Sequence, residues 1–242
     1  MNRLYAAMAL SVISLCAHAL DPSEESREGA PSAHFDYLVY AVTWQPTFCM
    51  LKPTTAGCDK TKNVFYTHGI WAYFNSTAQS ANRHPSSCIQ SAGCGQTEAA
   101  CELSNAVQEQ VQADQRFSEI VTESPEYLMK HEWKKHGTCY GTSQAQYFED
   151  FVKLRSAVNY NSDFNQFQGK SVDLDQLKSL FPVNTSFRCA SHNGKQYLYE
   201  VFFLIDRQGR PYTEDQKLQI GEKCQAREIH IPVVSSFASR SE

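Results

Sequence analysis

"KQYLYEVFFLID", residues 195–206, is a run of aromatic and β-branched residues that predicts a strand. Working outward from it, "AREIHIPVV" (226–234) predicts a second strand near the C-terminus. "FDYLVYAVTW" (35–44) and the start of "NVFYTHGIWAYF" (63–74) predict two more near the N-terminus. Strands therefore lie at both ends of the chain.

Helices are predicted between these strands. Residues 98–117 favour one helix, and residues 125–137 favour another, with Ser124 and Pro125 as cap and first-turn proline. Residues 143–158 carry apolar side chains at helical spacing. This order predicts an α+β fold with a central antiparallel sheet and helices packed against it.

Composition favours one globular domain. The chain has 242 residues, of which 42% are hydrophobic and 12% aromatic, which is typical of a protein with a sizeable core. Residues 75–96 are rich in small polar residues and predict a long loop, and no repeat or low-complexity linker divides the chain. We expect a polar lead-in at 20–34, a single domain at 35–234 and a short tail at 235–242.

The N-terminus has the pattern of a secretory signal. Arg3 supplies a positive charge, "LYAAMALSVISLC" (4–16) is a short apolar run, and Ala17-His18-Ala19 fits a small-x-small cleavage site. We therefore expect residues 1–19 to be removed, and the chain to be secreted, periplasmic or lumenal in an acidic compartment. The apolar run is too short for a membrane span, and no later segment approaches one.

Charge and cysteine content fit an exported protein. Cleavage after Ala19 would leave 21 basic and 26 acidic residues, a formal charge of −5, which argues against a basic stripe that tracks nucleic acid but permits a small positive cleft. Eight cysteines would remain, and an even count in an exported chain predicts disulfides. They lie at positions 49, 58, 88, 94, 101, 139, 189 and 224.

"MKHEWKKHGTCY", residues 129–140, gathers two histidines, a glutamate and three lysines. The segment could be a metal site, an acid–base site or a solvated helix face. On a regular helix His131 and His136 lie about 140° apart, so they could not both face one ion, and the zinc-protease spacing is absent. We expect no metal and no cofactor. Four-residue spacing instead pairs His131 with Lys135 and Glu132 with His136, along one wall of an anion-binding cleft.

"FYTHGIW" (65–71) and "HEWKKHGTC" (131–139) together resemble the two active-site segments of the ribonuclease T2 family. The second segment matches the family pattern His-Glu-Trp-x-Lys-His-Gly-Thr-Cys at every specified position. The first matches at Phe65, His68, Gly69 and Trp71. With "TWQPTFC" (43–49) and the cysteine layout, the resemblance spans about residues 35–230.

The resemblance implies a secreted, metal-independent endoribonuclease of little base specificity. It would cleave single-stranded RNA through a 2′,3′-cyclic phosphate to 3′-phosphate ends. His136 would be the general base and His68 the general acid, while His131 would position the phosphate. Glu132 and Lys135 would stabilise the pentacoordinate state.

The resemblance also implies that Trp71, with Tyr73 as a weaker candidate, stacks on a base. Ala72 stands where the family usually has proline, Tyr73 where it often has a polar residue, and Leu128 and Met129 where it often has aromatics. These departures leave the acid–base residues intact. They leave the base preference open.

The cysteine pairing stays open on the residues alone. The family implies a bridge from Cys139 to the loop after the first segment, and "HPSSC" favours Cys88 as its partner. The expected pairs are Cys49–Cys58, Cys88–Cys139, Cys94–Cys101 and Cys189–Cys224.

We expect RNA as substrate, no cleavage of DNA, no membrane partner and a monomer. Two other functions remain open: a non-catalytic binding protein on the same fold, and a zinc hydrolase. Asn75 and Asn184 lie in glycosylation patterns, which matter only in a host that glycosylates.

Overall fold

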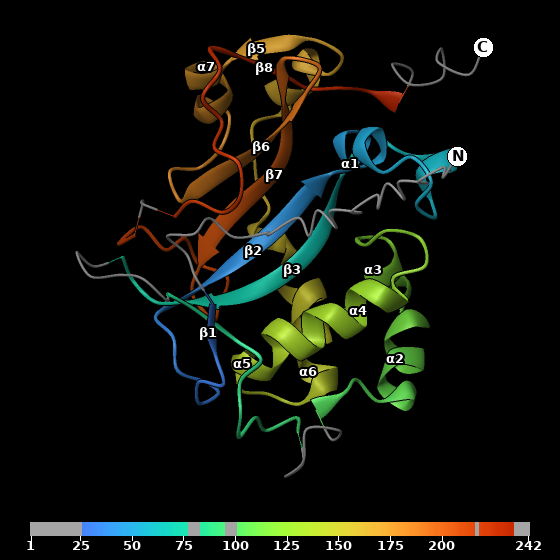
Figure 1. Ribbon diagram of the computed structural model, residues 1–242, viewed down its shortest axis with the longest axis vertical. Coiled ribbons are helices and arrows are strands. Elements are labelled where there is room, and N and C mark those ends of the chain that lie inside the picture. Colours follow the sequence, from blue (N-terminus) through green and yellow to red (C-terminus); the bar gives the residue numbers. More distant parts are fainter. Residues whose placement is uncertain (1–25, 77–82, 95–100, 216–217, 235–242) are drawn as a thin grey trace, which may run out of the picture.

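The predicted sheet forms the centre of the molecule, as Figure 1 shows for the computed structural model, which describes residues 26–76, 83–94, 101–215 and 218–234. Six strands make this sheet in the order β3-β2-β7-β8-β5, with β6 also paired to β7. They are β2 (Tyr37–Trp44), β3 (Phe65–Tyr73), β5 (Ser171–Asp173), β6 (Thr185–His192), β7 (Lys195–Ile205) and β8 (Glu228–His230).

Antiparallel pairing dominates the central sheet, so the predicted fold class is confirmed. The one departure among these strands is the short contact of β7 with β8, which is parallel. A separate two-stranded parallel sheet joins β1 (Ser26–Glu28) to β4 (His84–Ser86). The first of these strands lies in the predicted lead-in and the second in the predicted loop.

Both faces of the sheet are covered, and β2 shows how. Alternate residues of a strand point to opposite faces. Leu38, Tyr40 and Val42 pack into the large core that includes the helices. Val39 and Ala41 pack into a smaller cluster on the other face. β2 therefore has an apolar sequence without a polar side.

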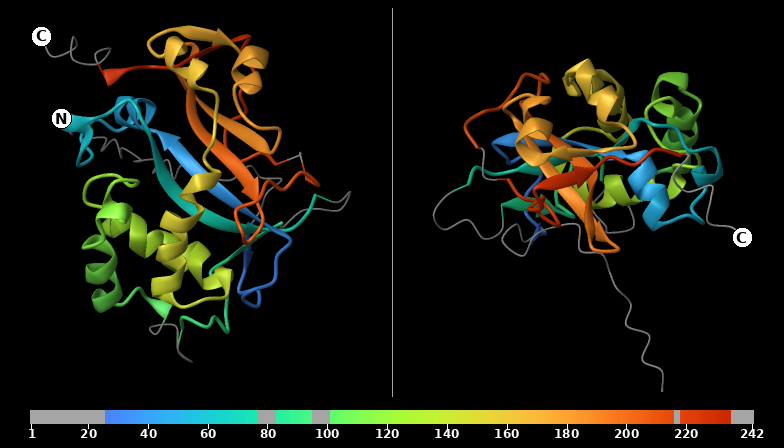
Figure 2. Two further views of the ribbon diagram at one scale, coloured as in Figure 1. Left: turned by 180° about the vertical axis from the view of Figure 1, so that it is seen from behind. Right: turned by 90° about the horizontal axis from the view of Figure 1, so that it is seen from above.

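Most of the helices between β4 and β5 gather beside β3, as Figures 1 and 2 show from three sides. They are α2 (Asn105–Gln112), α3 (Gln115–Ser118), α4 (Glu126–Glu132), the π-helical turn η4 (Trp133–Gly137), α5 (Thr138–Tyr140), α6 (Gln144–Lys153) and the 3₁₀ turn η5 (Leu154–Ala157). The 3₁₀ turn η6 (Ser162–Phe167) lies near β5 instead. Elsewhere lie α1 (Gln45–Leu51), η2 (Cys58–Lys60) and α7 (Leu174–Ser179).

Two helix predictions change in detail. The helix expected at 98–117 becomes α2 and α3, because Asp114 takes an extended conformation and its side chain accepts a hydrogen bond from the Arg116 amide, which starts a new helix. A helix that was not predicted, α1, follows β2 directly, with Pro46 in its first turn, where proline needs no amide donor.

Disulfides join the same four pairs that the resemblance implied, Cys49–Cys58, Cys88–Cys139, Cys94–Cys101 and Cys189–Cys224. The predicted signal peptide and C-terminal tail lie outside the described residues. Within them, no helix has the length and apolar character needed to cross a membrane. Asn184 is buried and its amide donates to the Leu204 carbonyl at 2.6 Å, which argues against glycosylation there.

Candidate active site

His68 is directed into the site by an irregularity in β3. Ala41 pairs with Gly69 and Val42 pairs with Thr67, so His68 is an extra residue without a partner on β2. Such bulges turn a side chain out of the regular alternation and are frequent beside active sites. The next residue must be glycine, because a Cβ on Gly69 would overlap the Glu132 carboxylate.

The other predicted catalytic residues come from α4 and η4, and here the geometric premise used for the sequence was wrong. Residues 133–137 form a π-helical turn rather than a regular α-helix. A π turn accommodates one residue more, which brings residues five apart closer to one face. The rings of His131 and His136 consequently lie 6.1 Å apart between centroids.

Trp71 lies between the two expected catalytic histidines. Its indole ring centroid is 5.2 Å from that of His68 and 5.2 Å from that of His136. Its Nε1 donates to Glu132 Oε2 at 2.8 Å. The side chain is thus a buried spacer that joins three of the predicted site residues.

Burial argues against the stacking role expected of Trp71 and Tyr73. Trp71 is 2% exposed and Tyr73 is 0% exposed, so neither ring offers a face to a nucleobase. Tyr73 packs instead on His84, with ring centroids 4.7 Å apart. The resemblance predicted the place of these residues in the chain but not the packing around them.

The second ring nitrogen of His68 meets a buried carboxylate. Glu200 on β7 is fully buried, and its Oε1 lies 2.6 Å from His68 Nδ1. Burial disfavours the charged imidazole, but the charge and hydrogen bond of Glu200, helped by Glu132, outweigh it and raise the pKa of His68. The pKa of Glu200 falls to about 2 because His68 and Arg188 outweigh the effect of its burial.

His136 has the opposite environment. The ring is buried, packs on His84 with centroids 4.9 Å apart, and its Nδ1 has no hydrogen-bond partner among the described residues. Burial, followed by the nearby His84 and Lys135, holds the pKa of His136 well below its usual value. His84 itself has a pKa lowered to about 4, again chiefly by burial. The pKa values of the two expected catalytic histidines are therefore shifted in opposite directions.

Glu132 is a buried carboxyl whose pKa is raised to about 7, because burial outweighs the neighbouring His68, Trp71 and Lys135. Its Oε1 lies 3.6 Å from His68 Nε2, a distance for an ion pair rather than a hydrogen bond. Lys135 is partly exposed and close enough to lower the pKa values of His131 and His136. It can supply positive charge to a bound anion.

A hollow of about 480 Å³ adjoins His68 and His131. Tyr127, 83% exposed, stands beside it and stacks on His131, with ring centroids 6.2 Å apart. Phe48 and Tyr66 also line the hollow and are partly exposed. These rings, unlike Trp71, have surface available to a flat ligand.

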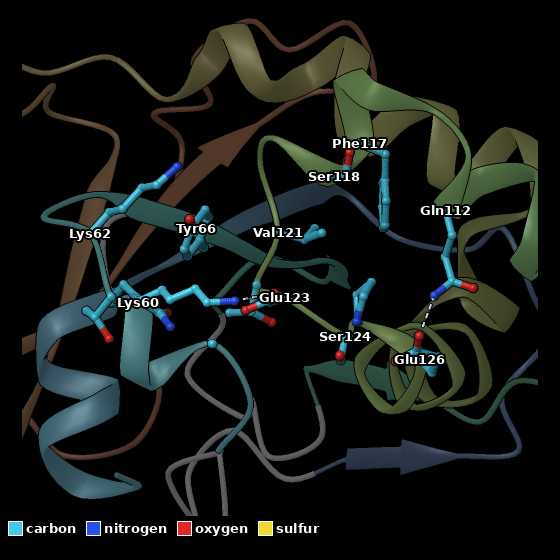
Figure 3. Close-up of a pocket in the computed structure, with 15 residues that line it drawn as sticks. Lys60, Lys62, Tyr66, Gln112, Phe117, Ser118, Val121, Glu123, Ser124 and Glu126 are labelled. Carbon is cyan, nitrogen blue, oxygen red and sulfur yellow. Dashed lines mark hydrogen bonds and ion pairs between the residues drawn. The ribbon is translucent and has the colours of Figure 1, made fainter. Parts of the chain in front are cut away.

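A second hollow, of about 450 Å³, continues from the first, and both are lined by Gln45, Tyr66 and Glu123. Figure 3 shows Lys60 and Lys62 on one side of it, with Lys60 directed at Glu123. The Lys60 Nζ and Glu123 Oε1 are 3.5 Å apart, and both side chains are exposed. The two hollows therefore adjoin along these shared residues.

The disulfide Cys88–Cys139 links two segments of the chain that lie beside the site. It joins the end of "HGTC" to the loop that follows β3, and the Cys88 amide also donates to Thr138 Oγ1 at 3.0 Å. The amide of Ser87 donates to the Lys135 carbonyl at 2.8 Å. The loop after β3 is thus fixed directly against η4.

His131, Glu132 and His136 also form a group that could hold a metal ion, since one ligand atom from each lies within 4.8 Å of the others. The π turn makes this possible. The same residues can equally move protons and bind an anion.

Three neighbours of the site were missed from the sequence: Glu200, Arg188 and His84. A signal for Glu200 was present, because it is a single acidic residue inside the apolar run "LYEVFFLI". A buried charge in a central strand requires a partner. Nothing in the sequence indicated that the partners would be His68 and Arg188.

Comparison with known proteins identifies relatives of this chain. The model of the "Ribonuclease T2 family" matches residues 35–221. A ribonuclease from Aeromonas hydrophila is 28% identical over 189 residues, covering 74% of this chain and 75% of the relative. Extracellular ribonuclease LE from Solanum lycopersicum is 24% identical, covering 86% of this chain and 88% of the relative. The fold resembles that of ribonuclease MC1 from the seeds of bitter gourd, with a TM-score of 0.56, 17% identity, and coverage of 81% of this chain and 100% of that one.

Proposed function

Because the chain belongs to the ribonuclease T2 family and is an RNA-cleaving enzyme, we propose that it cuts single-stranded RNA internally by two-histidine acid–base chemistry, without a metal ion. The 2′-hydroxyl of one nucleotide is the nucleophile. It attacks the adjacent phosphorus, the bond to the 5′-oxygen breaks, and a 2′,3′-cyclic phosphate forms. Water then opens the ring to a 3′-phosphate. DNA has no 2′-hydroxyl and is not a substrate.

His136 takes the proton of the 2′-hydroxyl, and His68 gives its Nε2 proton to the departing 5′-oxygen. In the hydrolysis step the two exchange tasks. His131 and Lys135 bind the phosphate oxygens. Glu132, with a pKa raised to about 7, is largely protonated in mildly acidic solution and can donate to an oxygen of the pentacoordinate state.

The observation that carries this proposal is the opposite tuning of two histidines on either side of Trp71. A general base must be neutral to accept a proton, and a lowered pKa keeps His136 neutral. A general acid must hold a proton, and a raised pKa keeps His68 protonated. Titratable groups pushed apart in this way indicate which is the acid and which the base.

The exposed rings beside the site fit a substrate of mixed sequence. Tyr127 is the best placed to stack on a base, because it is exposed beside His131. Stacking tolerates any base, since every base has a π-face. This arrangement supports little base specificity.

The disulfides and the N-terminal pattern support secretion into an oxidising space. The buried histidines support activity at mildly acidic pH. We propose that the enzyme acts as a monomer outside the cell, in a periplasm or in an acidic lumen.

The test is a digestion of single-stranded RNA and matched DNA in excess EDTA at mildly acidic pH, with fragment ends identified by mass spectrometry. We expect cleavage of RNA alone, to 2′,3′-cyclic ends, with EDTA having no effect. His136→Ala should abolish it, and Lys134→Ala, which changes an exposed neighbour, is the matched control.

If EDTA removed the activity and zinc restored it, His131, Glu132 and His136 would be metal ligands. RNA left intact by the correctly oxidised protein would contradict catalysis. Binding of RNA would then be the remaining function.

A further inference from the structure

Glu200 is a charged residue in a place where charge is costly. It lies in the middle of β7 with no exposed surface, between Tyr199 and Val201. An uncompensated buried carboxylate would destabilise the fold, so its partners define its role.

Three side chains contact the two oxygens of this carboxylate. Oε1 accepts from Thr43 Oγ1 at 3.0 Å and lies 2.6 Å from His68 Nδ1, while Oε2 accepts from Arg188 Nη1 at 2.8 Å. The three partners come from β2, β3 and β6, so three strands converge on one side chain. The His68 ring is thereby held on its Nδ1 side.

We propose that Glu200 is a positioning residue for His68, which orients the imidazole with Nε2 toward the scissile phosphate and balances its charge before the acid step. This inference rests on the proposed acid role of His68. Glu200 touches no substrate and acts only through the ring. A carboxylate that accepts from Nδ1–H leaves Nε2 as the nitrogen that gives up its proton, so it fixes which nitrogen reacts.

Arg188 keeps Glu200 in its charged form. Its guanidinium also lies over the Tyr199 ring, 5.0 Å from the centroid. Gly221 leaves room for it, since a Cβ there would overlap the Arg188 side chain. Without this cation, the carboxylate would have only His68 to balance its charge.

The charged neighbours of His68 influence it in opposite directions. Glu200 and Glu132 raise the pKa of His68, and Arg188 lowers it. Burial, followed by nearby positive charges that include His68, lowers the pKa values of His131 and His136 on the facing helix. Removing Glu200 should therefore lower the pKa of His68, and removing Arg188 should raise it.

The two opposite shifts in the pKa of His68 should be visible in the pH profile of activity. The enzyme is active only while His68 carries its proton, so activity falls as pH rises through the pKa of His68. In Glu200→Gln the alkaline limb of kcat/KM should move to lower pH, by about 1 to 3 units, the range for loss of an adjacent opposite charge. In Arg188→Gln it should move to higher pH.

The experiment measures the pKa of His68 by NMR of its ring, identified by comparison with His68→Ala, together with the pH profile of each variant. Asp150→Asn is the matched control, because Asp150 is also a buried carboxylate and accepts from Tyr140 at 2.7 Å, away from the site. It should leave both readouts unchanged.

A second substrate separates positioning from general stability. On RNA, where the leaving 5′-oxygen needs a proton, Glu200→Gln should lose about 100-fold in kcat. On uridine 3′-(4-nitrophenyl phosphate), whose leaving group needs no proton, the loss should be far smaller. Equal losses on both substrates would overturn the proposal.

The outcomes distinguish this inference from the proposed function. If the pKa of His68 in Glu200→Gln equals that in Asp150→Asn while the enzyme is active, Glu200 does not control His68. If the pKa values move as expected but RNA stays intact, the proposed function fails and the His68–Glu200 pair remains. Should Glu200→Gln fail to fold, the opposite shift expected of Arg188→Gln still tests the same coupling.

Discussion

Among the single residues of the site, Trp71 has the most testable position. It fills the space between His68 and His136, and its Nε1–H bonds Glu132. Trp71→Phe keeps a ring there but removes the donor. We expect kcat to fall about 10-fold, since a hydrogen bond of about 1.5 kcal/mol is lost, with KM unchanged. Steady-state kinetics on a dinucleotide checks this.

Tyr127→Ala is the matched comparison, because Tyr127 is exposed beside the site. It should raise KM and leave kcat nearly unchanged. The reverse pattern, a raised KM in Trp71→Phe and no effect in Tyr127→Ala, would restore Trp71 as the residue that stacks on a base.

At the scale of the element, the π turn η4 holds His136 in register with His131. Inserting an alanine after Lys134, which is exposed, should add one residue between the two histidines and rotate His136 by about 100° relative to His131. We expect activity to be lost while circular dichroism stays near that of the wild type. Lys134→Ala removes an exposed ion pair with Glu102 and should keep full activity.

An active insertion variant would show that this register of His131 and His136 is not needed for the site. Histidine NMR of that variant would then report whether His136 still lies against His84 and Trp71.

The sequence predicted elements better than it predicted their irregularities. β7, β2 and the central helices followed from apolar runs and spacing, because these patterns are local. The π turn has contacts with distant parts of the chain: Trp133 Nε1 donates to the Cys101 carbonyl, and Gly137 lies directly against the Tyr147 ring. The partners of Glu200 could not be predicted either. His68 is distant from Glu200 in the sequence, and only the order of the strands in the sheet brings the two side chains together. The two histidines expected to be catalytic could be singled out because the motif that carries them is specific.

At the scale of the whole molecule, the disulfides differ in what they hold. Cys88–Cys139 closes a loop with a sequence separation of 51 and fixes η4, whereas Cys49–Cys58 closes one of 9. Replacing each pair by alanine should lower the free energy of unfolding by about 4 and about 2.5 kcal/mol respectively. Only the first should also lower kcat. Denaturant titration and kinetics of both variants check this, and equal kcat values would refute it.

The bridge between Cys88 and Cys139 has a consequence for the cell that makes this enzyme. It forms only where thiols are oxidised, and intracellular thiols are kept reduced. A newly made chain inside a reducing compartment lacks the bond that holds its two histidine-bearing segments in register. We therefore expect the reduced chain to cleave the producing cell's own transcripts more slowly than the oxidised enzyme does.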